Sequence, residues 1–125
     1  MLMSGTSDFQ LLIADDDPNF RITVVEILQP HFKTIAVESG EQALDIVHNE
    51  SVDLVLLDMH MHLLTGLDTI RKLRDLELDL PCILMSSQVT SEMEQEASSL
   101  DTFSVLRKPP RKRELIDTIQ CALKV

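Results

Sequence analysis

Short apolar segments alternate with amphipathic segments along the whole chain, and this alternation constrains the fold more than any other feature. Apolar runs at 9–14, 33–38, 52–58, 82–87 and 103–107 predict strands, and segments with helical periodicity at 18–29, 39–50, 66–76, 91–100 and 111–123 predict helices. Strands that alternate with helices over short connections form a parallel sheet through right-handed crossovers. We therefore expect an α/β fold, a doubly wound five-stranded parallel sheet with helices on both faces.

Local signals support several of these elements. Pro18 suits the first turn of a helix whose inward stripe includes Phe20 and Val24, and Ser39 lies three residues before Gln42 with the spacing of a capping box. The segment 52–58 is almost continuously apolar, which indicates a strand covered on both faces. In the segment 66–76 we expect the leucine and isoleucine side chains to face inward: Leu67, Ile70, Leu73 and Leu76.

Composition indicates one acidic domain. The chain has 125 residues, 44% of them hydrophobic, and a formal net charge of −10, which repels a nucleic-acid backbone. Residues 1–8 have no signal-peptide pattern, so we expect a flexible polar leader, a domain at 9–125 and a cytoplasmic protein without membrane association. Cys82 and Cys121 both lie among apolar residues, and we expect them to be small buried side chains without a disulfide.

Polar residues gather where the predicted strands end. In an open parallel sheet, ligands bind outside the carboxyl ends of the strands. The residues at those ends are Asp15, Asp16, Asp58, Ser86 and Lys108. Crowded carboxylates favour a hard cation such as Mg²⁺, a carboxylate can attack phosphorus, and a lysine and a hydroxyl can neutralise the transferred group.

Four stretches at these positions resemble the response-regulator receiver domain of two-component signalling, with its flavodoxin-like, chemotaxis-regulator-like fold. They are "LLIADDDP", "DLVLLDMHM", "LPCILMSS" and "RKP", in matching order from about Phe9 to Leu123. The resemblance implies that Asp58 accepts a phosphoryl group from a histidine kinase or a phosphotransfer protein. It also implies a surface that switches between two states to control a downstream effector protein or domain. The chain would catalyse its own phosphorylation and dephosphorylation rather than turn over a substrate.

The resemblance assigns roles to the remaining site residues. Asp15, Asp16 and Asp58 would bind Mg²⁺, together with the main-chain carbonyl of His60. Ser86 and Lys108 would contact the phosphoryl group, and the Lys108–Pro109 bond would be cis.

The chain departs from the receiver pattern at several positions, of which two concern the loop after Asp58 and the switch. His62 stands where receivers usually have proline, and Val105 stands where they usually have an aromatic residue that takes part in the switch. Phe103, two residues earlier on the same predicted strand face, could substitute for that ring. The aspartate-dependent switch is the interpretation that we favour, and a receiver-shaped module that binds proteins without phosphorylation is the alternative.

Three further hypotheses stay open at this point. His60 and His62 alternate after Asp58 and could ligate a transition metal. A freestanding phosphohydrolase would need an acid two residues after the nucleophile, where His60 stands. A homodimer could form through the surface of the fourth helix, fifth strand and fifth helix, by pairing acids with bases. The acids there are Glu92, Glu94 and Glu96, and the bases are Arg107, Arg111, Lys112 and Arg113.

Overall fold

A five-stranded parallel sheet forms the centre of the computed structural model, which describes residues 8–125. The strands are β1 (Gln10–Ala14), β2 (Lys33–Val37), β3 (Leu54–Asp58), β4 (Cys82–Ser86) and β5 (Ser104–Arg107). The helices are α1 (Pro18–Leu28), α2 (Gly40–Asn49), α3 (Gly66–Asp75), α4 (Ser91–Ser99) and α5 (Lys112–Leu123). The strand order is β2-β1-β3-β4-β5 and all neighbours are parallel, so the expected fold class is confirmed. The expected leader lies outside the described residues, except for Asp8.

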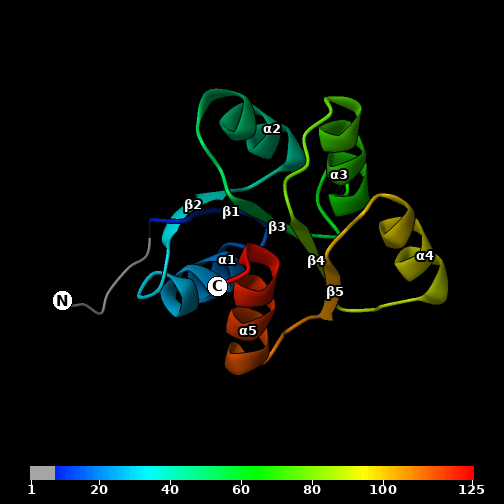
Figure 1. Cartoon of the computed structure of the whole chain (residues 1–125). Coiled ribbons are helices and arrows are strands. Elements are labelled where there is room, and N and C mark those ends of the chain that lie inside the picture. Colours follow the sequence, from blue (N-terminus) through cyan, green and yellow to red (C-terminus); the bar gives the residue numbers. More distant parts are fainter. Residues whose placement is uncertain (1–7) are drawn as a thin grey trace.

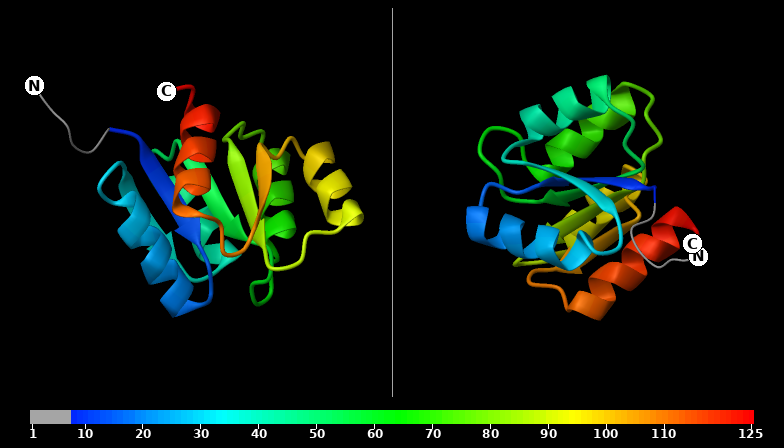
Figure 2. Two further views of the ribbon diagram at one scale, coloured as in Figure 1. Left: turned by 90° about the horizontal axis from the view of Figure 1, so that it is seen from below. Right: turned by 90° about the vertical axis from the view of Figure 1, so that its left-hand side faces the viewer.

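Helices cover both faces of the sheet (Figure 1). Helices α2, α3 and α4 cover one face and α1 and α5 the other, and the left-hand view of Figure 2 shows α1 and α5 in front of the strands. Alternate residues of each strand serve the two apolar clusters: Leu12 packs with α2, α3 and α4, whereas Leu11 and Ile13 pack with α1 and α5. All five residues of β3 are buried, as its continuous apolar pattern predicts. In the part of the chain that the structure describes, no helix has the length and apolar character needed to cross a membrane.

Side-chain caps fix where the helices beside the strand ends begin. Asp17 caps α1 by accepting a hydrogen bond of 3.0 Å from the Asn19 amide, and Thr65 forms a reciprocal capping box with Asp68 at the start of α3. Ser39 accepts from the Gln42 amide as predicted. The Gln42 side chain, however, accepts a hydrogen bond from the Glu38 amide at 2.7 Å, so the second half of the box is shifted by one residue.

Two predictions about buried side chains are wrong. Leu76 is 61% exposed, because α3 ends at Asp75 and Leu76 no longer follows the helical stripe. Cys121 is exposed, because it lies two residues after the inward Ile119 and therefore on the opposite side of α5. Cys82 is buried in β4, and both thiols are free, as expected.

Candidate functional site

Polar groups from four strands meet at one edge of the sheet. Asp15 directly follows β1, Asp58 is the last residue of β3, and Ser86 is the last residue of β4. Lys108 follows β5, whose last residue, Arg107, pairs in register with Ser86. Because all of these strands run in parallel, their carboxyl ends lie side by side, and the residues named from the sequence arrive at the same edge.

Three carboxylates form the centre of this edge. Carboxylate oxygens of Asp15, Asp16 and Asp58 all lie within 4.8 Å of one another. Asp15 is fully buried and Asp58 is 4% exposed, while Asp16 faces solvent. Burial and the charge of Asp15 raise the pKa of Asp58, against the opposing effects of Lys108 and of a backbone hydrogen bond with His60. The site therefore concentrates negative charge that the protein alone only partly neutralises.

Lys108 supplies the one ammonium in contact with these carboxylates among the described residues. Its Nζ lies 2.9 Å from Asp15 Oδ2 and 3.3 Å from Asp58 Oδ1. Burial opposes the ammonium form, but Asp15 and Asp58 outweigh it, and the pKa of Lys108 is raised. The Lys108–Pro109 bond is cis, as the resemblance implies. The lysine is thus held in its charged form between two acids from different strands.

Ser86 lies at the same edge, but its hydroxyl makes a local contact. Its Oγ donates to the Gln88 carbonyl at 2.8 Å and accepts from the Gln88 amide at 3.3 Å. The residue itself is fully buried at the end of β4. In this arrangement the hydroxyl is engaged with the β4–α4 loop and makes no hydrogen bond with Asp58.

The two histidines after Asp58 make no metal site with it. His60 and His62 are both exposed, and the buried Met61 stands between them. Across residues 8–125, neither imidazole belongs to a cluster of three side chains that could ligate one ion. The hypothesis of a histidine-based metal site therefore finds no support in the geometry.

The backbone beside Asp58 is packed closely against the start of α3. A Cβ added to Gly66 would lie 2.5 Å from Leu84 Cδ1 and 2.6 Å from the Asp58 carbonyl oxygen, so only glycine fits there. The Gly66 amide donates to the Met59 carbonyl at 2.9 Å. This contact holds the end of β3, and hence the main chain that carries Asp58, against α3.

Two residues of α1, neither of them predicted from the sequence as a site residue, contact the site. The Arg21 guanidinium donates a hydrogen bond of 2.7 Å to the Asp15 carbonyl, and Lys108 Nζ lies 4.2 Å from the centre of the Phe20 ring. Phe20 follows the apolar stripe of α1, and this pattern predicts a core residue. Its place four residues after the exposed acid, on the first turn of a helix that starts at the sheet edge, is the only signal that could have indicated a site contact.

Position 105 has no ring, and Phe103 lies away from Ser86. Val105 is half-buried and packs against the cluster formed with α2, α3 and α4. Phe103 is 46% exposed, and its amide donates to the carbonyl of Cys82, at the opposite end of β4 from Ser86. Phe103 therefore cannot replace a ring next to Ser86.

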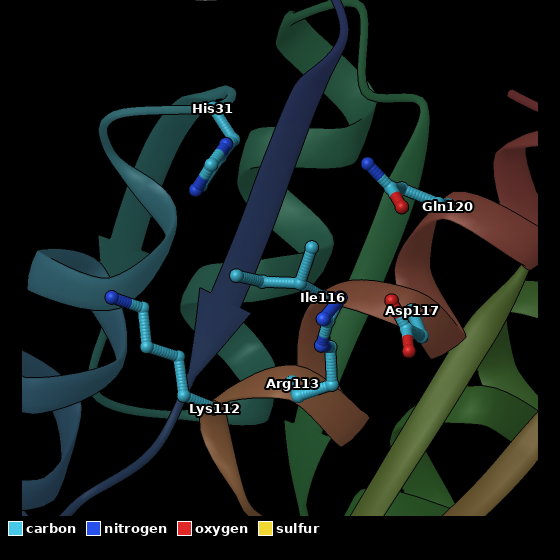
Figure 3. A pocket seen from close by; sticks show the side chains of 6 residues that line it. All are labelled: His31, Lys112, Arg113, Ile116, Asp117 and Gln120. Atoms are coloured by element: carbon cyan, nitrogen blue, oxygen red, sulfur yellow. The ribbon is translucent and has the colours of Figure 1, made fainter.

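A cavity of about 440 Å³ lies apart from the carboxylates (Figure 3). It is lined by His31 from the α1–β2 connection and by five residues of α5: Lys112, Arg113, Ile116, Asp117 and Gln120. None of these residues contributes to the polar edge of the sheet. The polar edge of the sheet is thus separate from this cavity.

Comparison with known proteins identifies the class to which this fold and site belong. The sequence model described as "Response regulator receiver domain" matches residues 11–120. The chain belongs to this family.

Relatives range from short chains to long ones. Sporulation initiation phosphotransferase F of Bacillus subtilis is 30% identical over 112 residues, which cover 89% of this chain and 90% of that protein. The transcriptional regulatory protein CpxR of Escherichia coli is 33% identical over 92% of this chain but only 49% of its own length. The sensory/regulatory protein RpfC of Xanthomonas campestris is matched over 16% of its length. The chain therefore spans most of one relative and a minor part of others.

Solved structures agree on the fold. The chemotaxis protein CheY4 of Vibrio cholerae superimposes with a TM-score of 0.88 at 22% identity, over 94% of this chain and all of that one. The receiver domain of the Francisella response regulator 1452 gives a TM-score of 0.88 at 24% identity, over 94% of this chain and 98% of that one. At these identities the likeness establishes the fold and nothing finer.

Proposed function

We propose that this receiver domain accepts a phosphoryl group on Asp58 in a Mg²⁺-dependent reaction and thereby changes a surface that other proteins recognise. One observation carries the proposal: carboxylates from β1 and β3 and the ammonium from β5 meet at a single edge. Asp58 is the member of the group that ends a strand; its carboxylate lies within 4.8 Å of that of Asp15 and 3.3 Å from the ammonium of Lys108.

The carboxylates suit a magnesium ion. Asp15, Asp16 and Asp58 offer only oxygen donors, and the buried Asp15 Oδ2 has Lys108 as its one ion-pair partner among the described residues. Hard oxygen ligands with room for water are what Mg²⁺ prefers, and we propose the His60 carbonyl as a further, neutral ligand on the strength of the family resemblance. When bound, the ion would offset the charge of the crowded acids and of the incoming phosphoryl oxygens.

The chain's own residues account for the other parts of the reaction. An Asp58 oxygen attacks phosphorus as the donor's phosphorus–nitrogen bond breaks, and the leaving imidazole keeps the electron pair and takes up a proton. Lys108 is placed to pair with a phosphoryl oxygen, since it already lies 3.3 Å from Asp58. Ser86 would exchange its bond with the Gln88 carbonyl for one with the phosphoryl group, which would move the β4–α4 loop.

The proposed function also implies binding partners and a location in the cell. We propose a histidine kinase or histidine phosphotransfer protein as the donor, a downstream effector protein or domain as the recipient of the signal, and a cytoplasmic location. The dimer through α4, β5 and α5 remains a proposal. In the structure Glu96 already pairs with Arg71 of α3, so Glu92 and Glu94 would have to supply most of the acidic side.

A phosphorylation-independent binding module is the second candidate. It is favoured by one observation: position 105 holds valine, and Phe103 lies by the opposite end of β4 from Ser86. A phosphohydrolase is disfavoured, because the position that needs a proton-donating acid holds the exposed His60.

The mass of the intact protein after incubation with acetyl phosphate and Mg²⁺ distinguishes the first two candidates. We expect a gain of one phosphoryl group that disappears with EDTA and in Asp58→Asn. The matched control is Asp45→Asn, which changes an exposed carboxylate on α2 and should be modified like the wild type. No gain, under conditions that modify a known receiver, would support the silent binding module.

A further inference from the structure

The ring of Phe20 lies against the ammonium of Lys108. The distance from Lys108 Nζ to the ring centroid is 4.2 Å, within the range of a cation–π contact. Phe20 comes from the first turn of α1 and Lys108 follows β5, so the contact joins two segments that are 88 residues apart in sequence and meet at the site. The Lys108 side chain is only 15% exposed, which makes the contact stronger than one in open water.

The ring complements the two carboxylates around this ammonium. An ammonium has three N–H donors, and among residues 8–125 Lys108 Nζ lies within 3.3 Å of two carboxylate oxygens, from Asp15 and Asp58. The electron-rich face of Phe20 offers a third attractive group that needs no hydrogen-bond acceptor. The ammonium is therefore held by two charges and one ring.

These three attractions respond differently to a bound cation. A divalent ion at the carboxylates draws on the same oxygens that hold Lys108, and it repels the ammonium directly. The attraction of the ring for Lys108 does not use those oxygens. Phe20 is therefore the partner that can keep the ammonium at the site while the carboxylates are engaged with the ion.

We propose that Phe20 is a positioning residue for Lys108, and that the rate of phosphoryl transfer to Asp58 depends on the π-electron density of its ring. This inference rests on the proposed function, because the reaction that it modulates is the phosphorylation of Asp58. It goes further by assigning a role to an aromatic side chain that follows the apolar stripe of α1.

A purely apolar role for Phe20 makes a different prediction. Phe20 is half-buried and packs against the cluster beneath α1 and α5, so any large apolar residue could fill its space. In that case Phe20→Leu would behave like the wild type apart from a change in stability. Fluorination of the ring, which weakens its attraction for cations with little change in size, would then have no effect on the rate.

The decisive experiment measures the rate of phosphorylation by acetyl phosphate at saturating Mg²⁺, together with the thermal midpoint of each variant. We expect Phe20→Leu to be slower by about two- to fivefold, the equivalent of one cation–π contact, and Phe20→Tyr to recover the rate. Mono-, di- and trifluorinated phenylalanines at position 20 should slow the reaction progressively at an unchanged midpoint. Phe103→Leu, at a ring far from Lys108, is the matched control and should leave the rate unchanged.

Proton NMR tests the contact without any phosphorylation. The ring current of Phe20 should shift the Lys108 ε-methylene protons upfield, and Phe20→Leu should abolish that shift. If the wild type shows the shift but takes no phosphoryl group, the proposed function fails while the contact stands. A wild type without the shift, or a phosphorylation rate that is flat across the fluorinated series, would overturn the inference.

Discussion

Replacement of Asp58 by asparagine should stabilise the protein in the absence of divalent cations. Asparagine has nearly the same shape and can still accept a hydrogen bond from Lys108, but it carries no charge. The raised pKa of Asp58 indicates that the folded state disfavours its ionised form, through burial first and then through Asp15. The substitution therefore removes a charge that lowers the free energy of unfolding.

The size of the effect follows from the distances. Carboxylate oxygens of Asp15 and Asp58 lie within 4.8 Å, where two unit charges at an effective dielectric constant of about 20 repel by about 3.5 kcal/mol. On the same basis, Lys108 Nζ at 3.3 Å attracts the Asp58 carboxylate by about 5 kcal/mol, but the same ammonium also pairs with Asp15. The attraction by Lys108 exceeds the repulsion by Asp15 by about 1.5 kcal/mol on this basis. Burial, the largest cause of the raised pKa of Asp58, therefore decides the sign. We expect a gain on the order of 1–2 kcal/mol in the free energy of unfolding.

Urea unfolding in EDTA and in saturating Mg²⁺ measures this effect. In EDTA at neutral pH, Asp58→Asn should be more stable than the wild type, whereas Asp45→Asn should match it. As the pH falls through the raised folded pKa toward the unfolded value of 3.8, the wild type protonates Asp58 and its deficit should shrink. Mg²⁺ should stabilise the wild type more than the variant, because binding to the folded state adds to stability. An Asp58→Asn protein that is less stable in EDTA, or equal gains from Mg²⁺, would refute the reasoning.

Three further outcomes follow from the same contacts. Lys108→Met should lose about 2–4 kcal/mol of unfolding free energy at neutral pH, because two buried carboxylates lose their cation. The pKa of Lys108 is raised, so this stabilisation is present below the unfolded pKa of 10.5 and is lost as the pH rises through the folded pKa. If the difference in unfolding free energy between the wild type and Lys108→Met does not narrow in urea titrations at alkaline pH, the reasoning is contradicted. Gly66→Ala should cost about 1–3 kcal/mol in the same assay, since its Cβ meets the Asp58 carbonyl and Leu84, and an unchanged unfolding midpoint would speak against this close packing. A thiol reagent should modify Cys121 quickly and Cys82 only on unfolding, because burial raises the pKa of Cys82 to about 11; equal rates would exclude the burial of β4.

The sequence was sufficient for the parts of the fold that depend on pattern. The wholly apolar β3 predicts a central strand, and the acids at the ends of β1 and β3 must then lie near Lys108 because parallel strands end at the same edge. Helix ends were less predictable. Leu76 continues the apolar stripe of α3 in sequence, but the helix stops one residue earlier and the side chain faces solvent.

Side-chain contacts across elements could not be predicted from the sequence. The place of the Phe20 ring depends on how the first turn of α1 lies relative to Lys108, which follows β5. The apolar spacing of α1 alone does not distinguish a ring that faces the core from one that faces Lys108. The hydrogen bond from Arg21 to the Asp15 carbonyl likewise depends on how α1 packs and could not be predicted from spacing. Ser86 illustrates a third limit, because its position at the end of β4 is predictable but the direction of its hydroxyl depends on the Gln88 backbone.

A crystal structure of the protein with Mg²⁺ and beryllofluoride, which mimics a phosphoryl group, tests the central claim most directly. The account predicts beryllium bonded to the Asp58 carboxylate and Mg²⁺ in contact with Asp15, Asp16 and Asp58. It also predicts Lys108 on a fluorine, and Ser86 turned from the Gln88 carbonyl toward the adduct. Magnesium bound elsewhere, or an Asp58 that stays unmodified while a control receiver forms its adduct, would contradict the claim that these strand ends form a phosphorylation site.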